Sequence, residues 1–147
     1  MDLILRNARV VGNEDVVVDV GIDGGRIAAI VPDLQAGGRT IDLGGRLVSP
    51  GLIETHIHLD KSNILDRCRA DKGDLEEAIQ EVAKAKKSFT PEDVYERGKR
   101  TLERCILNGT THMRTQLEVD PGIGLRGFDG IKQLIKEYPE SVTSGFG

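Results

Sequence analysis

Two histidines separated by a single residue, His56 and His58, are the side chains of this sequence best placed to do chemistry together. They lie in the apolar stretch 52–59, which reads as a buried β-strand. Side chains at positions i and i+2 of a strand point to the same face, so the two imidazoles are expected to converge. Neutral imidazole nitrogen is a good ligand for zinc or iron. The spacing therefore predicts part of a metal site, although by itself it fits a chance pair in a core strand equally well.

Four polar residues lie near this pair or on the next predicted strand. Asp60 could orient a metal ligand or cap the following loop. Lys61 could contact a substrate, but a solvated loop lysine is the favoured interpretation. His112 is favoured as a packed or loop-facing histidine. Gln116 is the one retained as a candidate substrate-binding residue, because its amide could hydrogen-bond a base edge; it could also simply satisfy backbone groups.

The first fifty residues supply short strands and glycine turns. Runs of β-branched and aliphatic residues predict strands at residues 3–5, 16–23, 26–31, 41–43 and 46–48. The pair Gly24 and Gly25 predicts a hairpin between the second and third runs, because glycine accepts positive φ. Gly44 and Gly45 predict a second small hairpin between the last two runs. Residues 1–50 are therefore predicted to form a small N-terminal domain of the β-sandwich type, present here in part.

A Ser-Pro-Gly corner at residues 49–51 predicts a boundary. The strand at 52–59 is followed by predicted helices at 75–87 and 91–107, a strand at 110–119 and a helix at 128–138. Asp74 and Thr90 are the expected N-caps of the first two helices. This alternation is typical of an α/β fold with a parallel sheet. We expect residues 51–147 to form the first two β/α units of an incomplete (β/α)8 barrel, whose active sites lie at the carboxyl ends of the strands.

Longer motifs around the histidines resemble a known family. Residues 47–61 read Leu-Val-Ser-Pro-Gly-Leu-Ile-Glu-Thr-His-Ile-His-Leu-Asp-Lys, which resembles the first barrel strand of the amidohydrolase superfamily. Residues 3–8 and 23–30 resemble its N-terminal β-domain. The His-Leu-Asp-Lys ending and the run Asn-Gly-Thr-Thr-His-Met-Arg-Thr at 108–115 resemble the cytosine deaminase branch more closely. Many members of that branch continue with His-x-Asp where this sequence has Gln116, so the exact substrate stays open.

The resemblance implies a metal-dependent hydrolase that acts on a C–N bond of a cyclic amidine or pyrimidine-like substrate, as in the hydrolytic deamination of cytosine. It implies one divalent metal ion, zinc or iron, that activates water. It assigns His56 and His58 as two of the metal ligands. In that family the other ligands and the proton-transfer residues come from later strands, so the catalytic residues are unknown from this sequence. The implied partner is a small heterocyclic molecule.

Composition excludes several other classes of protein. Charged residues make up 30% and hydrophobic residues 38% of the sequence, with a net charge of -4, which favours a soluble globular protein. Acidic and basic residues are interspersed, so nucleic acid is not an expected partner, and no apolar run is long enough for a membrane span. The two cysteines favour a reducing, cytoplasmic setting. The Gly-x-Gly-x-x-Gly letters at residues 122–127 are favoured as a strand-to-helix loop rather than a phosphate-binding loop.

The 147 residues fall short of the roughly 250 that a (β/α)8 barrel needs. A third strand would be expected to begin in the last stretch, residues 142–147. We expect, in this order, a truncated or partial form of a larger hydrolase, one half of a split enzyme completed by a complementary chain, or a non-catalytic assembly module. Activity of this chain alone is therefore left open, and a homo-oligomer or association with a complementary chain is expected.

Overall fold

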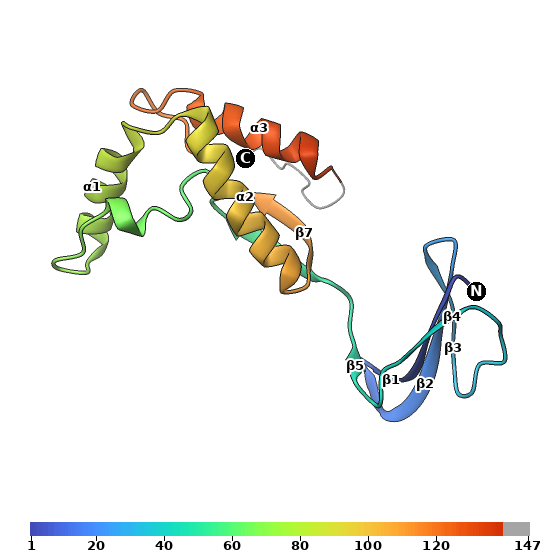
Figure 1. Cartoon of the computed structure of the whole chain (residues 1–147). Helices are drawn as coiled ribbons and strands as arrows, with labels where there is room; N and C mark the ends of the chain where they lie inside the picture. Colours follow the sequence, from blue (N-terminus) through green and yellow to red (C-terminus); the bar gives the residue numbers. More distant parts are fainter. Residues whose placement is uncertain (140–147) are drawn as a thin grey trace. The chain divides into compact units, whose positions relative to one another are not determined.

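The computed structural model describes residues 1–139. The chain divides between Pro50 and Gly51 into two compact units, called here the N-terminal unit and the C-terminal unit (Figure 1). The predicted third strand at residues 142–147 lies outside the described residues. Among the helices of residues 1–139, none combines the length and the apolar character that crossing a lipid bilayer requires.

The N-terminal unit is one mixed β-sheet. Its strands are β1 (Leu3–Val10), β2 (Asn13–Asp23), β3 (Arg26–Val31), β4 (Arg39–Asp42) and β5 (Leu47–Val48). β1 pairs antiparallel with β2, which pairs antiparallel with β3. β4 and β5 both run parallel to β1. Only this single sheet is formed within residues 1–50, so a sandwich remains a prediction for this unit.

The hairpin between β2 and β3 is confirmed. Asp23 pairs with Arg26 across the two-residue turn. Gly24 and Gly25 in that turn have φ values of 56° and 73°. Positive φ at both central residues is the conformation that the right-handed twist of the flanking strands favours in a two-residue turn.

The second predicted hairpin is wrong. Gly44 and Gly45 do have positive φ, but β4 and β5 pair with β1 instead of with each other. The reason lies in β1, where Asn7 also has positive φ, 53°. The carbonyl oxygen of Asn7 accepts a hydrogen bond of 2.7 Å from the amide of Gly45, and its side chain donates one of 3.0 Å to Asp42. The glycine turn thus follows a kink in the neighbouring strand, and the chain continues in the same direction.

A partly buried ion pair links β1 and β2, the two inner strands of this sheet. The side chain of Asp19 is 8% exposed and pairs with Arg6. Its carboxylate also accepts hydrogen bonds from the amides of Asn7, at 3.0 Å, and Leu34, at 2.9 Å. Burial by itself would raise the pKa of Asp19, but these hydrogen bonds and the charge of Arg6 outweigh it and lower the pKa below its usual value.

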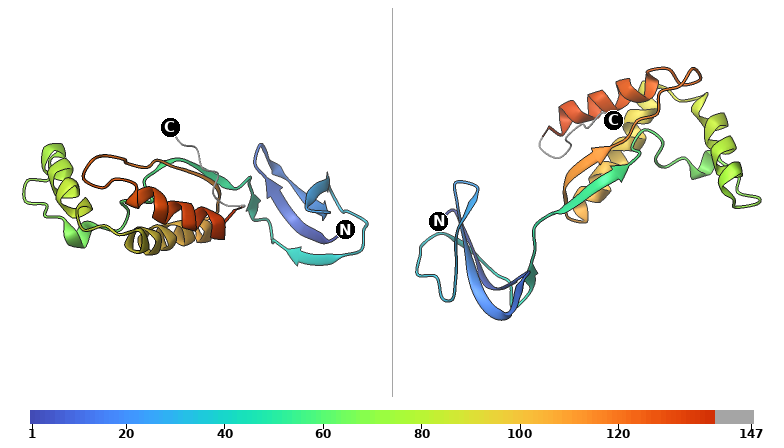
Figure 2. Two further views of the ribbon diagram at one scale, coloured as in Figure 1. Left: turned by 90° about the horizontal axis from the view of Figure 1, so that it is seen from above. Right: turned by 180° about the vertical axis from the view of Figure 1, so that it is seen from behind.

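The C-terminal unit alternates strands and helices. Its elements are β6 (Leu52–Ile57), a short 3-10 turn η1 (Leu65–Arg67), α1 (Leu75–Lys86), α2 (Pro91–Leu107), β7 (Thr110–Thr115) and α3 (Arg126–Glu137). β6 and β7 pair in parallel and lie side by side (Figure 2). The α/β class is confirmed, and within residues 1–139 these two strands form no closed barrel. β7 ends earlier than predicted and α3 begins earlier.

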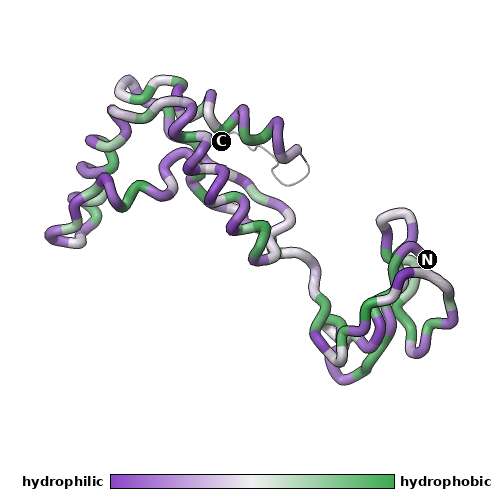
Figure 3. The backbone as a smooth tube through the Cα atoms, in the orientation of Figure 1, coloured by the Kyte–Doolittle hydropathy of each residue, from purple (hydrophilic) through white to green (hydrophobic). Residues whose placement is uncertain are grey.

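Local signals place the starts of α1 and α2 where the sequence predicts them. Asp74 accepts a hydrogen bond of 2.8 Å from the amide of Glu77, and Thr90 accepts one of 3.2 Å from the amide of Asp93. Both are N-caps, which satisfy amides that have no partner inside the helix. Hydrophilic and hydrophobic residues are mixed along α2 (Figure 3), and Val94 and Leu102, eight residues apart, lie on the face that packs into the core, as in an amphipathic helix.

The core of the C-terminal unit lies where α2 and α3 meet the end of the parallel strands. It is formed by Leu59, Ile64, Ala85, Phe89, Val94, Leu102, Met113, Ile123, Ile131 and Leu134. Gly130 on α3 lets the two helices approach closely, because a Cβ there would lie 2.5 Å from the carbonyl oxygen of Pro91. α1 contributes a single buried residue, Ala85. The core therefore fixes α2, α3 and the strand ends firmly, and α1 much less.

Candidate functional site

The two histidines lie next to each other at the carboxyl end of β6. His56 is exposed on the strand, and His58 is half-buried just beyond Ile57, where the strand ends. Their ring centroids are 5.4 Å apart, with an angle of 65° between the ring planes. Ile57 and Leu59 alternate with them and pack into the core. The structure thus brings together the two imidazoles that the sequence singles out, away from the helix-packed side of the strand.

His58 has one nitrogen turned inward. Its Nδ1 is buried and lies 3.8 Å from Oδ1 of Asp60, and neither atom has a hydrogen-bond partner within the described residues. Burial lowers the pKa of His58, and the charge of Lys61 acts in the same direction. The ring is therefore favoured in its neutral form, which is the form that binds a metal ion.

Asp60 is held on its other sides. Asp60 is 1% exposed, and its Oδ2 accepts a hydrogen bond of 3.1 Å from the backbone amide of Glu118, which follows β7. Burial raises the pKa of Asp60, and the hydrogen bond from Glu118 opposes that rise. A Cβ at Gly127 of α3 would lie 3.6 Å from the Cβ of Asp60, so α3 packs against this side chain. The carboxylate joins the loop after β6 to the loop after β7.

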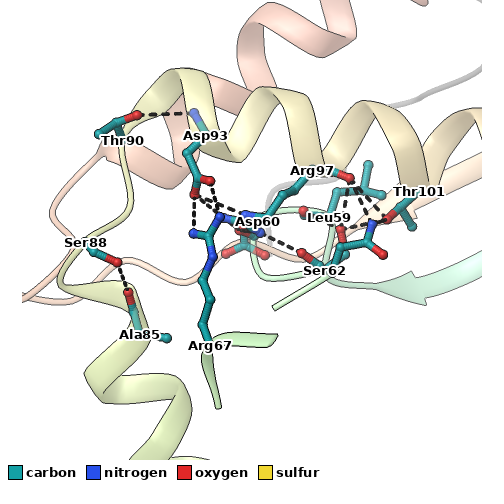
Figure 4. Close-up of polar contacts among 11 residues, drawn as sticks. Leu59, Asp60, Ser62, Arg67, Ala85, Ser88, Thr90, Asp93, Arg97 and Thr101 are labelled. Atoms are coloured by element: carbon teal, nitrogen blue, oxygen red, sulfur yellow. Dashed lines mark hydrogen bonds and ion pairs between the residues drawn. The ribbon is translucent and has the colours of Figure 1, made fainter. Parts of the chain in front are cut away.

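Arg97, on α2, fixes the backbone of the same loop. It is 1% exposed, and its guanidinium donates to the carbonyl oxygens of Asp60, at 3.1 Å, and Ser62, at 2.7 Å (Figure 4). It also bonds to Asp93 one helical turn earlier, and lies 4.3 Å from the ring centroid of Phe89. A buried arginine is stable only when its donors are matched in this way.

Sequence reasoning missed Arg97. An arginine in a helix is usually a solvated residue, so its type alone gives no reason to single it out. The signal that could have found it is the i, i+4 spacing of Asp93 and Arg97, which places an acceptor beside the guanidinium. The carbonyl oxygens of Asp60 and Ser62 that complete its shell come from another part of the chain and carry no sequence signal.

Lys61 is not the solvated loop lysine that the sequence favours. Its side chain is 23% exposed and pairs with Glu118. The other oxygen of Glu118 accepts from Lys86 of α1 at 2.7 Å, and Lys86 also reaches Asp120 at 2.7 Å. These charges tie α1 to the loop after β7.

Gln116 is the first residue of the loop after β7. Its backbone N–H donates a 2.7 Å hydrogen bond to the carbonyl oxygen of Ile57, so its backbone lies level with the end of β6.

His112 stands apart from the histidine pair in its contacts. It is exposed on β7, and its Nδ1 lies 3.1 Å from the hydroxyl of Thr111, so the packed interpretation is wrong. Residues 122–125 of the glycine-rich stretch lie in the loop between β7 and α3, as favoured, and residues 126 and 127 begin α3. The carboxylate of Asp120 accepts hydrogen bonds from the amides of Gly122, at 2.7 Å, and Ile123, at 3.1 Å. Those amides are therefore already satisfied from within the loop.

The imidazoles of His56 and His58 could supply some, but not all, of the ligands of a metal ion. Two adjacent imidazoles, one with its Nδ1 turned toward a carboxylate, are a common arrangement of metal-binding histidines. No group of three or more histidine, cysteine or acidic side chains able to hold a metal ion occurs within residues 1–139. His56 and His58 therefore fit two positions of a coordination sphere that usually has four or more.

Known proteins resemble this chain in sequence and in fold. The chain is 30% identical over 147 residues to N-isopropylammelide isopropyl amidohydrolase of Pseudomonas sp. (strain ADP), covering 96% of this chain and 36% of that protein. It resembles the crystal structure of 5-methylcytosine deaminase from Klebsiella pneumoniae liganded with 5-fluorocytosine, with a TM-score of 0.84 and 28% identity over 97% of this chain and 35% of that one.

Two further relatives extend this comparison. The crystal structure of N-isopropylammelide isopropylaminohydrolase from Burkholderia multivorans ATCC 17616 aligns with a TM-score of 0.72 and 28% identity, over 99% of this chain and 37% of that one. An allantoinase of Escherichia coli (strain SMS-3-5 / SECEC) is 44% identical over 61 residues, 41% of this chain and 14% of that protein. The chain thus spans about a third or less of the length of these relatives. Residues 39–133, which include β6, β7 and both histidines, match the amidohydrolase family, and the chain belongs to that family.

Proposed function

We propose that this chain contributes the first two metal ligands, His56 and His58, of a metal-dependent amidohydrolase. The reaction proposed is hydrolysis of a C–N bond in a small nitrogen heterocycle of the cyclic amidine or pyrimidine type, as in cytosine deamination. The observation that carries the proposal is the contact of the two imidazole rings, 5.4 Å apart, at the carboxyl end of a parallel strand. In barrels of this architecture, that end of the strands is where active sites are built.

The relatives support the substrate class. One is named as a deaminase of 5-methylcytosine and two as hydrolases of N-isopropylammelide. We propose a substrate of the same chemical kind for the protein to which this chain belongs. Gln116 is proposed as a substrate contact, because its backbone lies level with the end of β6 and an amide can both donate to and accept from a base edge.

The residues of this chain would have distinct tasks in that reaction. A bound zinc or iron ion supplies Lewis acidity, which makes water a nucleophile near neutral pH. His56 and His58 would hold the ion through neutral imidazole nitrogens. Asp60, Arg97 and the core would keep His58 in one place. The remaining ligands would come from residues other than those described here, because residues 1–139 hold no cluster of three.

Zinc titration of the purified chain tests the metal ligands. Isothermal calorimetry near neutral pH should show one zinc ion per chain, with binding lost in both His56→Ala and His58→Ala because each removes a ligand. The sequence offers a matched control, since His112 is its remaining histidine. His112→Ala should bind zinc as the parent does. Zinc affinity that is unchanged in His58→Ala would contradict the assignment.

The substrate class requires a separate measurement. The zinc-loaded chain is incubated with cytosine, 5-methylcytosine and N-isopropylammelide, and released ammonia or isopropylamine is quantified. Turnover that disappears in His58→Ala would support hydrolysis by this chain. Absence of product from a preparation that binds zinc through His58 would contradict activity of this chain alone, while the titration still judges the metal ligands.

A further inference from the structure

Asp60 faces His58 from inside the core. Its Oδ1 and the Nδ1 of His58 are both buried and lie 3.8 Å apart, and neither has a hydrogen-bond partner within the described residues. Buried polar atoms without partners are rare, because each gives up its bonds to water and receives nothing in return. A hydrogen bond between the two would satisfy both atoms at once, provided that Nδ1 carries the proton.

The contacts of Asp60 fix the orientation of its carboxylate. Its Oδ2 is engaged by the amide of Glu118 at 3.1 Å, and its backbone carbonyl is held by two donors of Arg97, each at 3.1 Å. Gly127 of α3 packs against the same side chain. Because three elements fix Asp60, Oδ1 is presented to His58 in one orientation.

We propose that Asp60 is a positioning residue for His58, which accepts a hydrogen bond from the Nδ1 proton and so fixes the tautomer in which Nε2 is free to bind a metal ion. This inference rests on the proposed function, in which His58 is a metal ligand. A ring held in this tautomer loses no freedom and moves no proton when the ion binds, so the site is prepared before the metal arrives.

The Asp60→Asn variant provides a sharp test because its amide can take only one useful orientation. The amide proton of Glu118 needs an acceptor, so the side-chain oxygen of asparagine must occupy the position of Oδ2. The NH2 group then faces Nδ1 of His58 as a donor. Nδ1 must become an acceptor, and the proton moves to Nε2, the atom that would bind the metal. The substitution therefore reverses the tautomer without changing the size of the side chain.

The tautomer can be read in the metal-free chain. A two-bond 1H–15N correlation spectrum of the full chain contains signals from three histidine rings, which single His→Ala variants assign. The parent should show His58 protonated at Nδ1, and Asp60→Asn should show it protonated at Nε2. Asp120→Asn is the matched control, because it removes the same charge from a carboxylate bonded to Lys86 instead. It should leave the His58 signals unchanged.

Zinc affinity is the second readout. Asp60→Asn should weaken zinc binding by roughly 10- to 100-fold, the usual effect of removing a group that orients a histidine ligand, while Asp120→Asn should not. An Nε2-protonated His58 in the parent, or an unchanged tautomer in Asp60→Asn, overturns the inference. Zinc binding lost in His58→Ala but unchanged in Asp60→Asn also overturns it and leaves the proposed function standing. Zinc binding indifferent to His58→Ala overturns both.

Discussion

The guanidinium of Arg97 donates two hydrogen bonds, each of 3.1 Å, to the carbonyl oxygen of Asp60. The carbonyl oxygen of this loop residue is therefore bonded by a side chain of α2 and not by the backbone of a neighbouring strand. Its positive charge is balanced by Asp93, which is also bonded by Arg67 at 2.6 Å. The position of the loop that carries the candidate metal ligand thus depends on a residue of α2.

Replacing Arg97 by methionine should destabilise the C-terminal unit by about 3 kcal/mol, because buried carbonyl oxygens of Asp60 and Ser62 lose their donors. Urea unfolding followed by tyrosine fluorescence measures the loss, since both tyrosines, Tyr95 and Tyr138, belong to this unit. Arg67→Met is the control. The side chain of Arg67 is 33% exposed, and its loss should cost less than about 1 kcal/mol. Equal losses in the two variants would contradict the role given to Arg97.

Two glycines of α3 should respond oppositely to the same substitution. Gly130→Ala places a Cβ 2.5 Å from the carbonyl oxygen of Pro91, so α2 and α3 must separate, with an expected loss of about 1–3 kcal/mol. At Gly127 the new Cβ meets its nearest neighbours at 3.6 Å, an ordinary contact. The gain in helix propensity, up to about 1 kcal/mol, is common to both variants, so Gly127→Ala should be neutral or stabilising. Thermal unfolding of the pair isolates the steric effect, and a stable Gly130→Ala would refute it.

The N-terminal unit should lose stability in acid through Asp19. The pKa of Asp19 is lowered in the folded state below its ordinary value of 3.8, because hydrogen bonds and Arg6 outweigh the effect of burial. The stabilisation is therefore complete above that ordinary value and is lost as the pH falls through the lower, folded pKa. Amide resonances of β1, β2 and β3, followed during an acid titration, should report this loss.

Asp19→Asn is the variant that isolates this contribution. It should destabilise the sheet by roughly 1–2 kcal/mol at neutral pH, since the charge-assisted bond to Arg6 is weakened, and it should flatten the acid dependence. Asp15→Asn, at an exposed position of β2, serves as the control. An acid transition that is equally steep in Asp19→Asn and in the parent would count against this explanation.

Lys86 should determine how firmly α1 is attached. α1 has one buried residue, so its contacts with Glu118 and Asp120 through Lys86, both of 2.7 Å, are a large part of its attachment. Lys86→Met should speed amide hydrogen exchange in α1 by roughly tenfold. Lys84→Met, on the same helix with a 68% exposed side chain, should change exchange little. Unaltered protection of α1 in Lys86→Met would show that other contacts hold it.

Sequence could predict those elements whose signals are local. Asp74 and Thr90 act as N-caps where expected, because capping involves a side chain and an amide only three residues away. The pair Gly24 and Gly25 correctly predicts a hairpin. The similar pair Gly44 and Gly45 predicts one that does not form, because the path of the chain there follows the kink at Asn7, which is distant in the sequence.

In the candidate site, too, only the local contacts could be predicted from the sequence. The proximity of His56 and His58 follows from strand periodicity, which is local. The hydrogen bond between Asp60 and Glu118 spans 58 residues, and the contacts of Arg97 with the loop span more than 30. These depend on how α2, α3 and β7 pack, and no short motif encodes them.

The contacts that fix Asp60 all come from residues 58–127. The contacts that shape the candidate ligand loop are thus encoded by one contiguous stretch of about half the chain. A chimaera that receives residues 52–137, from β6 to the end of α3, should keep the orientation of His58, because Ile131 and Leu134 of α3 belong to the same core as Leu59.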